Sequence, residues 1–234
     1  MATWSPSPAR AVIGLLLLTA TLAGCGSSSS GNGVAAKSPA AILAAAKLAA
    51  DDATSVHVAG SIVTAKAPIT FDMELLTGKG ARGTLSESGA SFELIQIGGT
   101  VYLKGSAAFY RRIGGSEAAK LLEGKWLKAP ASSSSLAALS SLINLDELID
   151  SVLANHSTLA KGATSTVAGE RVIALTDTAN GGTLYVATSG QPYPIEITKA
   201  GTDGGKIVFD DWDQAVTLTA PEDAIDITQL GAGR

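Results

Sequence analysis

Histidine and cysteine are scarce in this chain, whose 234 residues include two histidines and one cysteine. A single cysteine forbids an intrachain disulfide, and the three residues together are too few for a zinc site built from cysteine and histidine. Charged residues are also few, at 16% against about 25% in typical domains. The 21 acidic residues outnumber the 17 basic ones, so no basic excess is available to neutralise phosphates, and no nucleic-acid partner is predicted.

Apolar residues and glycine are abundant instead: 46% of the chain is hydrophobic, and glycine occurs 26 times. This composition argues against intrinsic disorder of the whole chain. Aromatic residues reach only 5%, so the core must be built mainly from aliphatic side chains. Frequent glycine favours many short strands joined by tight turns.

The N-terminus has the pattern of a secretory signal followed by a lipid attachment site. An apolar run over residues 11–23 follows Arg10 and is too short to cross a hydrocarbon core, which takes a helix of about 20 residues. Residues 22–25 (Leu-Ala-Gly-Cys) resemble the lipobox of bacterial lipoproteins, in which the cysteine thiol takes a diacylglyceryl group. The resemblance implies that the signal peptide, residues 1–24, is removed and that Cys25 becomes the lipidated N-terminus. The alternative is an ordinary signal peptide with a free cysteine.

Residues 25–37 are predicted to be a flexible tether, because they are rich in glycine and serine. A helix is expected over 38–52, with Ser38 as its N-cap and Pro39 at the first helical position. A short helix is predicted over 117–123, and an apolar stripe predicts a helical segment over 135–154.

Strand-like alternation fills most of the remaining chain. Ile69, Phe71, Met73 and Leu75 alternate with polar residues, a period of two that indicates a half-buried strand. Similar patterns or flanking turns predict strands over 56–62, 81–87, 92–97, 101–104, 157–167, 170–177, 182–188, 193–199, 205–210 and 215–219. Consecutive antiparallel strands with helices gathered apart define an α+β fold. We expect one curved antiparallel sheet of about ten or eleven strands, a half-barrel whose concave face is covered by helices, in a single domain over 38–230.

Residues with catalytic or metal-binding chemistry are few. His57 lies in an alternating strand and points away from the face of Val56 and Val58, and no nucleophile elbow is present. The carboxylate clusters at 51–52 and 146–147 mark helix ends, and the one at 210–213 is interpreted as a solvated turn, because it lacks a calcium-loop pattern. We therefore predict no catalytic residue, no metal ligand and no cofactor. A hydrolase of envelope lipids that uses His57 or His156 stays as an alternative.

From Ser38 to Leu230 the mature chain resembles the LppX/LprG (LppX_LprAFG) family of actinobacterial lipoproteins, which have a LolA-like fold. The resemblance is carried by the lipobox and by the segments 55–60, 97–104, 125–127, 194–197 and 208–212. It implies a protein that is not an enzyme, anchored to the extracytoplasmic face of the cell membrane, which binds acylated lipids or lipoglycans and carries them across the cell envelope. Its implied partners are these lipids, the membrane that holds its lipid anchor, and a membrane transporter.

Positions for a lipid cavity follow from the apolar periodicity of strands and helices. The candidates are Val56, Val58, Ile62, Phe71, Met73, Leu75, Phe92, Leu94, Val101, Leu103, Leu139, Leu142, Ile149, Val152, Leu184, Val186, Ile195 and Ile197. The same side chains could instead fill a solid core. In that case the protein would be a non-catalytic envelope scaffold or sensor that binds a protein partner.

Overall fold

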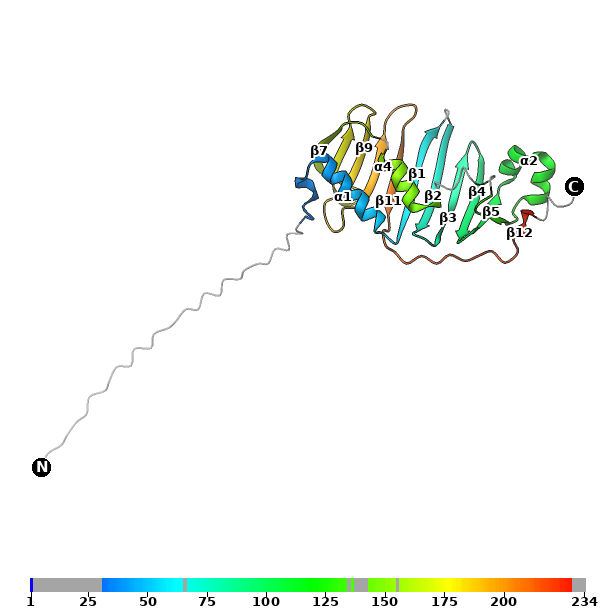
Figure 1. Cartoon of the computed structure of the whole chain (residues 1–234), viewed down its shortest axis with the longest axis horizontal. Coiled ribbons are helices and arrows are strands. Elements are labelled where there is room, and N and C mark those ends of the chain that lie inside the picture. The colour runs from blue at the N-terminus through cyan, green and yellow to red at the C-terminus, as the bar shows by residue number, and fades with distance from the viewer. Residues whose placement is uncertain (2–30, 65–66, 134–135, 137–142, 155, 229–234) are drawn as a thin grey trace. The chain divides into compact units, whose positions relative to one another are not determined.

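The computed structural model describes residues 1, 31–64, 67–133, 136, 143–154 and 156–228 (Figure 1). The chain divides into two compact units, residues 1–30 and 31–234, and the described fold is that of the second. The predicted signal peptide, Cys25 and the cavity candidates Leu139 and Leu142 lie outside the described residues.

The described part of the chain contains one open sheet of twelve strands, in the order β12-β6-β5-β4-β3-β2-β1-β11-β10-β9-β8-β7. All neighbouring strands are antiparallel except β12 and β6, which are parallel. The predicted α+β class with an open antiparallel sheet is confirmed. The strands are β1 (Ser55–Thr64), β2 (Ala67–Leu76), β3 (Gly80–Glu87), β4 (Ala90–Ile97), β5 (Thr100–Gly105), β6 (Leu127–Pro130), β7 (Leu159–Val167), β8 (Glu170–Asp177), β9 (Gly182–Ala187), β10 (Pro194–Lys199), β11 (Gly205–Asp210) and β12 (Ile225–Asp226).

Two helices, α1 (Pro39–Asp51) and α4 (Leu145–Ala154), lie across one face of the sheet in contact with each other (Figure 1). A short 3-10 turn, η1 (Val34–Ala36), precedes α1, and α2 (Ala107–Leu122) packs against β4 and β5. As predicted, α1 begins after Ser38, whose hydroxyl accepts a hydrogen bond from the amide of Ala41.

Helix α2 is longer than the sequence pattern indicates. It begins at Ala107 rather than at 117, because Ser106 caps it by accepting a hydrogen bond from the amide of Phe109 at 3.2 Å. Gly115, two residues before the predicted start, has a left-handed backbone with φ of 78° and kinks the helix. The sequence pattern therefore marked the segment after the kink and missed the segment before it.

The predicted strand at 215–219 is wrong, since these residues form no ladder with any described strand. They belong to an extended segment that runs along the strand ends from β11 to β12 (Figure 1). Val216 and Leu218 are half-buried while their neighbours are exposed. The period of two thus reports an extended chain with one side covered, not a paired strand. Strands β6 and β12 were not predicted.

The pairing of β1 with β11 joins the two halves of the sheet, β1 to β6 and β7 to β11. His57 is opposite Asp210 in this pair, and Val58 is opposite Phe209. The two strands approach so closely that a Cβ added to Gly60 would lie 2.2 Å from the carbonyl oxygen of Lys206. Glycine is required there by the close backbone contact.

Most of the core lies between the sheet and the helices. Its fully buried side chains include Leu75 and Phe209 from the sheet, Ile42 from α1 and Ile149 from α4. A second, smaller cluster contains Val172, Ala187 and Ile195. The β8–β9 register puts Val172 opposite Ala187, whereas Ile173, opposite Val186, belongs to the main core, so the small cluster lies on the other face.

An apolar cavity beneath helix α4 as the candidate functional site

Helix α4 owes its position to a cap and an apolar stripe. The carboxamide oxygen of Asn144 accepts a hydrogen bond from the amide of Glu147 at 3.3 Å, as in an N-cap. Leu145, Ile149 and Leu153 recur every four residues and are buried against the sheet. The neighbouring stripe of Leu148 and Val152 is only half-buried, although it packs against the same core.

An apolar cavity of about 160 Å³ lies between this second stripe of α4 and the sheet. Its walls are formed by Leu148, Ser151 and Val152 of α4 and by Val58, Ile62, Phe71, Met73, Leu75, Leu85 and Ile207 of four adjacent strands. The hydroxyl of Ser151 donates a hydrogen bond to the carbonyl oxygen of Leu148 within the helix. With hydrocarbon walls on nearly every side, the space offers water few hydrogen-bond partners and suits an alkyl chain.

Two wider pockets follow, of which the first adjoins the cavity and the second adjoins the first. One, of about 370 Å³, shares Val152 with it and reaches Leu184 and Ile197 on β9 and β10. The other, of about 440 Å³, lies between α1 and α4 and shares Leu43, Leu153 and Leu159 with the first. Apolar walls therefore continue from beneath α4 toward the gap between the two helices.

Polar groups line the outer parts of these pockets. The ammonium group of Lys47 on α1 lies 2.6 Å from a carboxylate oxygen of Asp150 on α4 and 2.8 Å from one of Asp51. Hydrogen bonds to Asp150 and then to Asp51 raise the pKa of Lys47 above its usual value. The Lys47–Asp150 ion pair thus connects the two helices beside the pocket of about 440 Å³.

Asp177 is the last residue of β8 and lines the pocket of about 370 Å³. Its carboxylate accepts hydrogen bonds from the hydroxyl and amide of Ser157 and from the amide and side chain of Asn180. These bonds, led by the one from the Ser157 hydroxyl, hold the pKa of Asp177 well below its usual range. The loop before β7 is thereby fixed to the turn after β8.

Some of the predicted cavity residues line the cavity or the adjoining pocket, and others belong to the surrounding core. Val58, Ile62, Phe71, Met73, Leu75 and Val152 line the cavity, and Leu184 and Ile197 line the adjoining pocket. Others are buried in the surrounding core: Val56, Leu94, Val101, Ile149 and Val186. Phe92 packs at the edge of this core and contacts Phe109 of α2 at a ring distance of 5.2 Å, while Leu103 pairs with Leu127 on β6.

The prediction that Ile195 shares a face with Ile197 is wrong. The register between β9 and β10 shifts between Pro194 and Glu196, an irregularity of the β-bulge kind. A bulge inserts one residue and reverses the alternation beyond it. Ile195 consequently packs on Val172 and Ala187, in the cluster on the face away from the helices.

Several wall residues were missed by the sequence analysis. Leu85 lies directly opposite Phe71 in the β2–β3 pair and could have been found from that register. Leu148 belongs to the recognised helical stripe, next to Val152. Leu43, Leu159 and Ile207 reach the pockets from α1, β7 and β11, and only the tertiary fold brings these elements together.

Neither histidine lies in a set that resembles a hydrolase centre within the described residues. His57 points away from the face of Val56 and Val58, as predicted, and its ring contacts the carboxylates of Asp210 and Asp72. Partial burial lowers its pKa, but the hydrogen bonds to Asp210 and Asp72 outweigh this effect, so the pKa of His57 is raised. The ring nitrogen Nδ1 of His156 lies 2.8 Å from the carbonyl oxygen of Ser157.

No helix in the described part of the chain has both the length and the apolarity to span a membrane.

An open antiparallel sheet with helices across one face places the protein in the LolA-like class of folds. Two solved structures share this architecture. LprF from Mycobacterium bovis is 15% identical, with a TM-score of 0.55 over 78% of this chain and 96% of that one. The lipoprotein LppX from Mycobacterium tuberculosis is 17% identical, with a TM-score of 0.50 over 78% of this chain and 100% of that one.

The predicted resemblance to the LppX/LprG lipoproteins is thus confirmed at the level of the fold. No model of a known protein family matches the sequence. No curated protein is significantly similar to it either.

Proposed function

We propose that this protein is a membrane-anchored lipoprotein that binds the acyl chains of a lipid or lipoglycan beneath α4 and carries them across the cell envelope without catalysing a reaction. The observation that carries the proposal is the cavity of about 160 Å³ between α4 and the sheet, whose walls are almost entirely apolar. Hydrocarbon gains about 25 cal/mol for each Å² removed from water, so such walls bind acyl chains without precisely placed polar groups.

The adjoining pockets extend the proposal to the rest of the lipid. Acyl chains occupy the cavity and the apolar pocket next to it, and the polar headgroup lies near Lys47, Asp150 and His156 at the gap between α1 and α4. The fold that the protein shares with the lipoprotein LppX supports the proposal that it is a lipoprotein too.

The anchor is part of the same proposal. Cys25 is the lipidated residue, and residues 25–37 tether the domain to the extracytoplasmic face of the cell membrane. Two or more acyl chains hold a protein stably at a membrane, since each buried CH₂ contributes about 0.8 kcal/mol. Replacement of Cys25 by alanine should release the protein from the membrane fraction, and mass spectrometry of the N-terminal peptide should show the acyl mass in the unaltered protein alone.

Native mass spectrometry of residues 26–234 tests lipid binding directly. The expected result is a mass increase after purification from an envelope-containing host, or after incubation with a long-chain fatty acid, and displacement of a fluorescent acyl probe. A ligand-free mass together with no uptake of acyl probes would reject the carrier function. Stoichiometric capture of an envelope protein by such a lipid-free domain would favour the scaffold alternative.

A further inference from the structure

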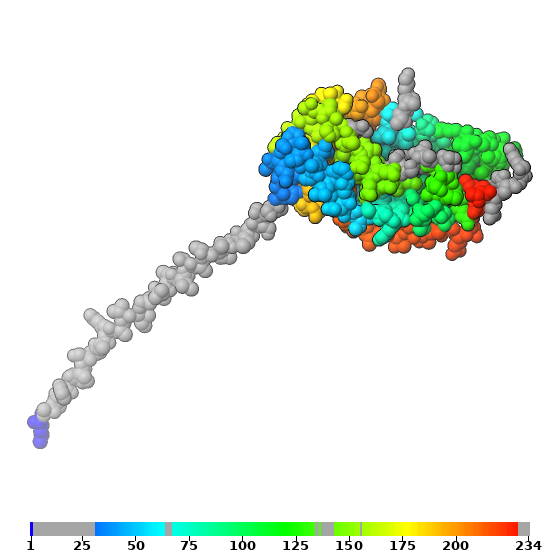
Figure 2. Space-filling model, in the orientation of Figure 1, coloured from blue at the N-terminus to red at the C-terminus, as the bar shows by residue number. Residues whose placement is uncertain are grey.

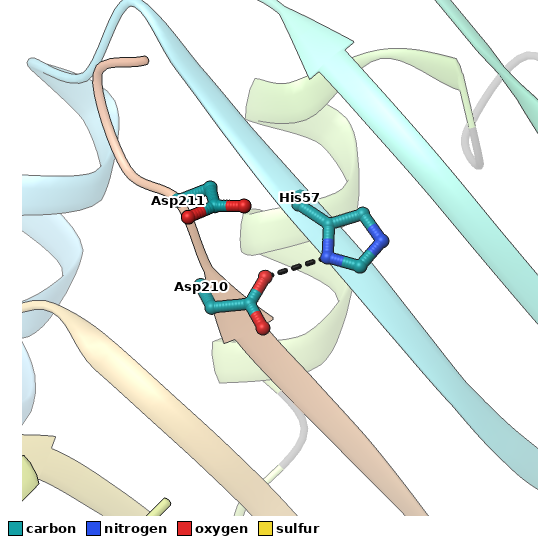
Figure 3. Close-up of side chains that lie close together, drawn as sticks. All are labelled: His57, Asp210 and Asp211. Atoms are coloured by element: carbon teal, nitrogen blue, oxygen red, sulfur yellow. Dashed lines mark hydrogen bonds and ion pairs between the residues drawn. The ribbon is translucent and has the colours of Figure 1, made fainter. Parts of the chain in front are cut away.

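A histidine lies among three carboxylates on the sheet face opposite the helices. His57 on β1 is directly opposite Asp210 on β11, and Asp72 comes from β2 on the other side of β1. Asp211 follows the last residue of β11. Figure 3 shows the carboxylates of Asp210 and Asp211 on the Nδ1 side of the imidazole ring. The group therefore spans three adjacent strands at the junction of the two halves of the sheet.

The candidate ligand atoms of this group lie close together. The Nδ1 atom of His57 lies 2.6 Å from Oδ1 of Asp210, and its Nε2 atom lies 3.2 Å from Oδ1 of Asp72. Ligand atoms of His57, Asp210 and Asp211 all lie within 4.8 Å of one another. One ion can therefore reach the three side chains after small rotations about their side-chain bonds.

The negative charge of the carboxylates in this group is larger than the positive charge of the side chains that they contact. Other acidic side chains on the same face have cationic partners, as Glu74 has Arg82 and Glu196 has Lys206. Within the described residues, Asp72 and Asp210 bond only to the single imidazole of His57, and the carboxylate of Asp211 has no hydrogen bond or ion pair. Even a protonated His57 would leave an excess of two negative charges, and this excess favours a divalent cation.

We propose that His57, Asp210 and Asp211 bind a divalent transition-metal ion of the Zn²⁺ type. The Nδ1 atom and one oxygen from each aspartate are the ligands, and water completes the coordination. The ion takes the position of the Nδ1 proton, which is released to solvent. Asp72 accepts a hydrogen bond from Nε2–H and so fixes the tautomer that presents Nδ1 to the ion, the carboxylate–histidine–metal arrangement of many protein sites.

The position of the site means that a bound ion should stabilise the folded sheet. Because His57 belongs to β1 and Asp210 to β11, the ion connects the two halves of the sheet. It binds the folded state only, and by mass action it raises the unfolding temperature. The site lies on the face away from the cavity, so zinc binding and acyl binding are measured independently.

Calorimetric titration of the full chain with ZnCl₂, together with thermal unfolding with and without Zn²⁺, tests the proposal. The expected results are one Zn²⁺ bound per chain and a higher unfolding temperature, with no competition from a large excess of Mg²⁺, which prefers oxygen ligands. His57→Ala and Asp210→Asn should each abolish both effects. Asp72→Asn should weaken zinc affinity by roughly 10- to 100-fold, the usual effect of removing such an orienting carboxylate.

Three further variants distinguish a metal site from a folding defect or from unspecific binding. Asp211 has no partner whose loss would destabilise the fold, so Asp211→Asn should lower zinc affinity while the metal-free unfolding temperature is unchanged. The chain has only one other histidine, and His156→Ala should bind Zn²⁺ like the unaltered chain. Glu93→Gln removes the same charge from the same face, but its partner is Lys104, and it should also bind normally. Absence of zinc binding by the unaltered chain, or equal loss in His57→Ala and His156→Ala, would overturn the proposal, whatever the result for acyl probes.

Discussion

Val152→Phe is the substitution that best separates a hollow interior from a packed one. Val152 lies at the boundary between the cavity of about 160 Å³ and the pocket of about 370 Å³, so a larger side chain there fills the space that an acyl chain would use. An empty apolar cavity destabilises a protein by about 24 cal/mol per Å³, which gives about 4 kcal/mol for 160 Å³. A guest that fills it recovers up to about this amount, equivalent to roughly a thousandfold in affinity.

The hollow interior predicts opposite changes in stability and in binding. In the lipid-free protein, Val152→Phe should keep or increase the free energy of unfolding, measured by urea denaturation. In a displacement assay with a fluorescent fatty acid, the same variant should bind at least about tenfold more weakly, a loss of about 1.4 kcal/mol. Leu48→Phe is the matched control, because Leu48 is on α1 with 63% of its surface exposed and lines none of the pockets described above.

Two results would refute this reasoning. If Val152→Phe binds the acyl probe as tightly as the unaltered protein, the cavity beneath α4 is not the acyl site. If the variant is destabilised by about 1–3 kcal/mol, the usual cost of overpacking, the space is already filled by side chains.

Three further predictions concern polar interactions in other parts of the fold. Lys47→Met removes the exposed ion pair with Asp150 and should lower the free energy of unfolding by less than about 1 kcal/mol, an effect that shrinks in high salt. The hydrogen bonds to Asp177, first of all from Ser157, stabilise its charged form, so their contribution is complete above about pH 4 and is lost as the pH falls further. In urea denaturation at several pH values, the free energy of unfolding of Asp177→Asn should therefore depend less on pH below about pH 4. The hydroxyl of Tyr193 donates a hydrogen bond to the carboxylate of Asp213 at 2.5 Å. Burial, followed by this hydrogen bond, raises the pKa of Tyr193 to about 12, so Tyr193→Phe should remove an ionisation near that pH in absorbance titrations.

Each of these predictions has an outcome that contradicts it. A loss well above 1 kcal/mol for Lys47→Met, unchanged by salt, would mean that the methylene chain of Lys47 packs the helices together. If the free energy of unfolding of Asp177→Asn falls just as steeply at low pH, this pH dependence comes from other carboxylates. A titration curve that Tyr193→Phe leaves unaltered at high pH would show that the Tyr193 hydroxyl is not held as described.

The local features of this protein could be predicted from its sequence alone. Ser38 and Asn144 specify the starts of α1 and α4, because each side chain bonds to an amide within three residues. The period of two in β2 correctly assigned Phe71, Met73 and Leu75 to one face, since successive side chains of a strand alternate. These signals depend on near neighbours in the chain, and they were sufficient for the α+β class.

The contacts between distant elements, and the position at which the alternation of a strand breaks, became visible in the folded structure and could not be predicted from the sequence. The register shift in β10 moved Ile195 to the other face, and no residue type announces such a shift. His57 and Asp210 are 153 positions apart, so their contact follows from the β1–β11 pairing and not from any motif. The cavity has the same origin: its walls come from one helix and four strands, and whether they enclose space depends on how far apart the completed fold holds them.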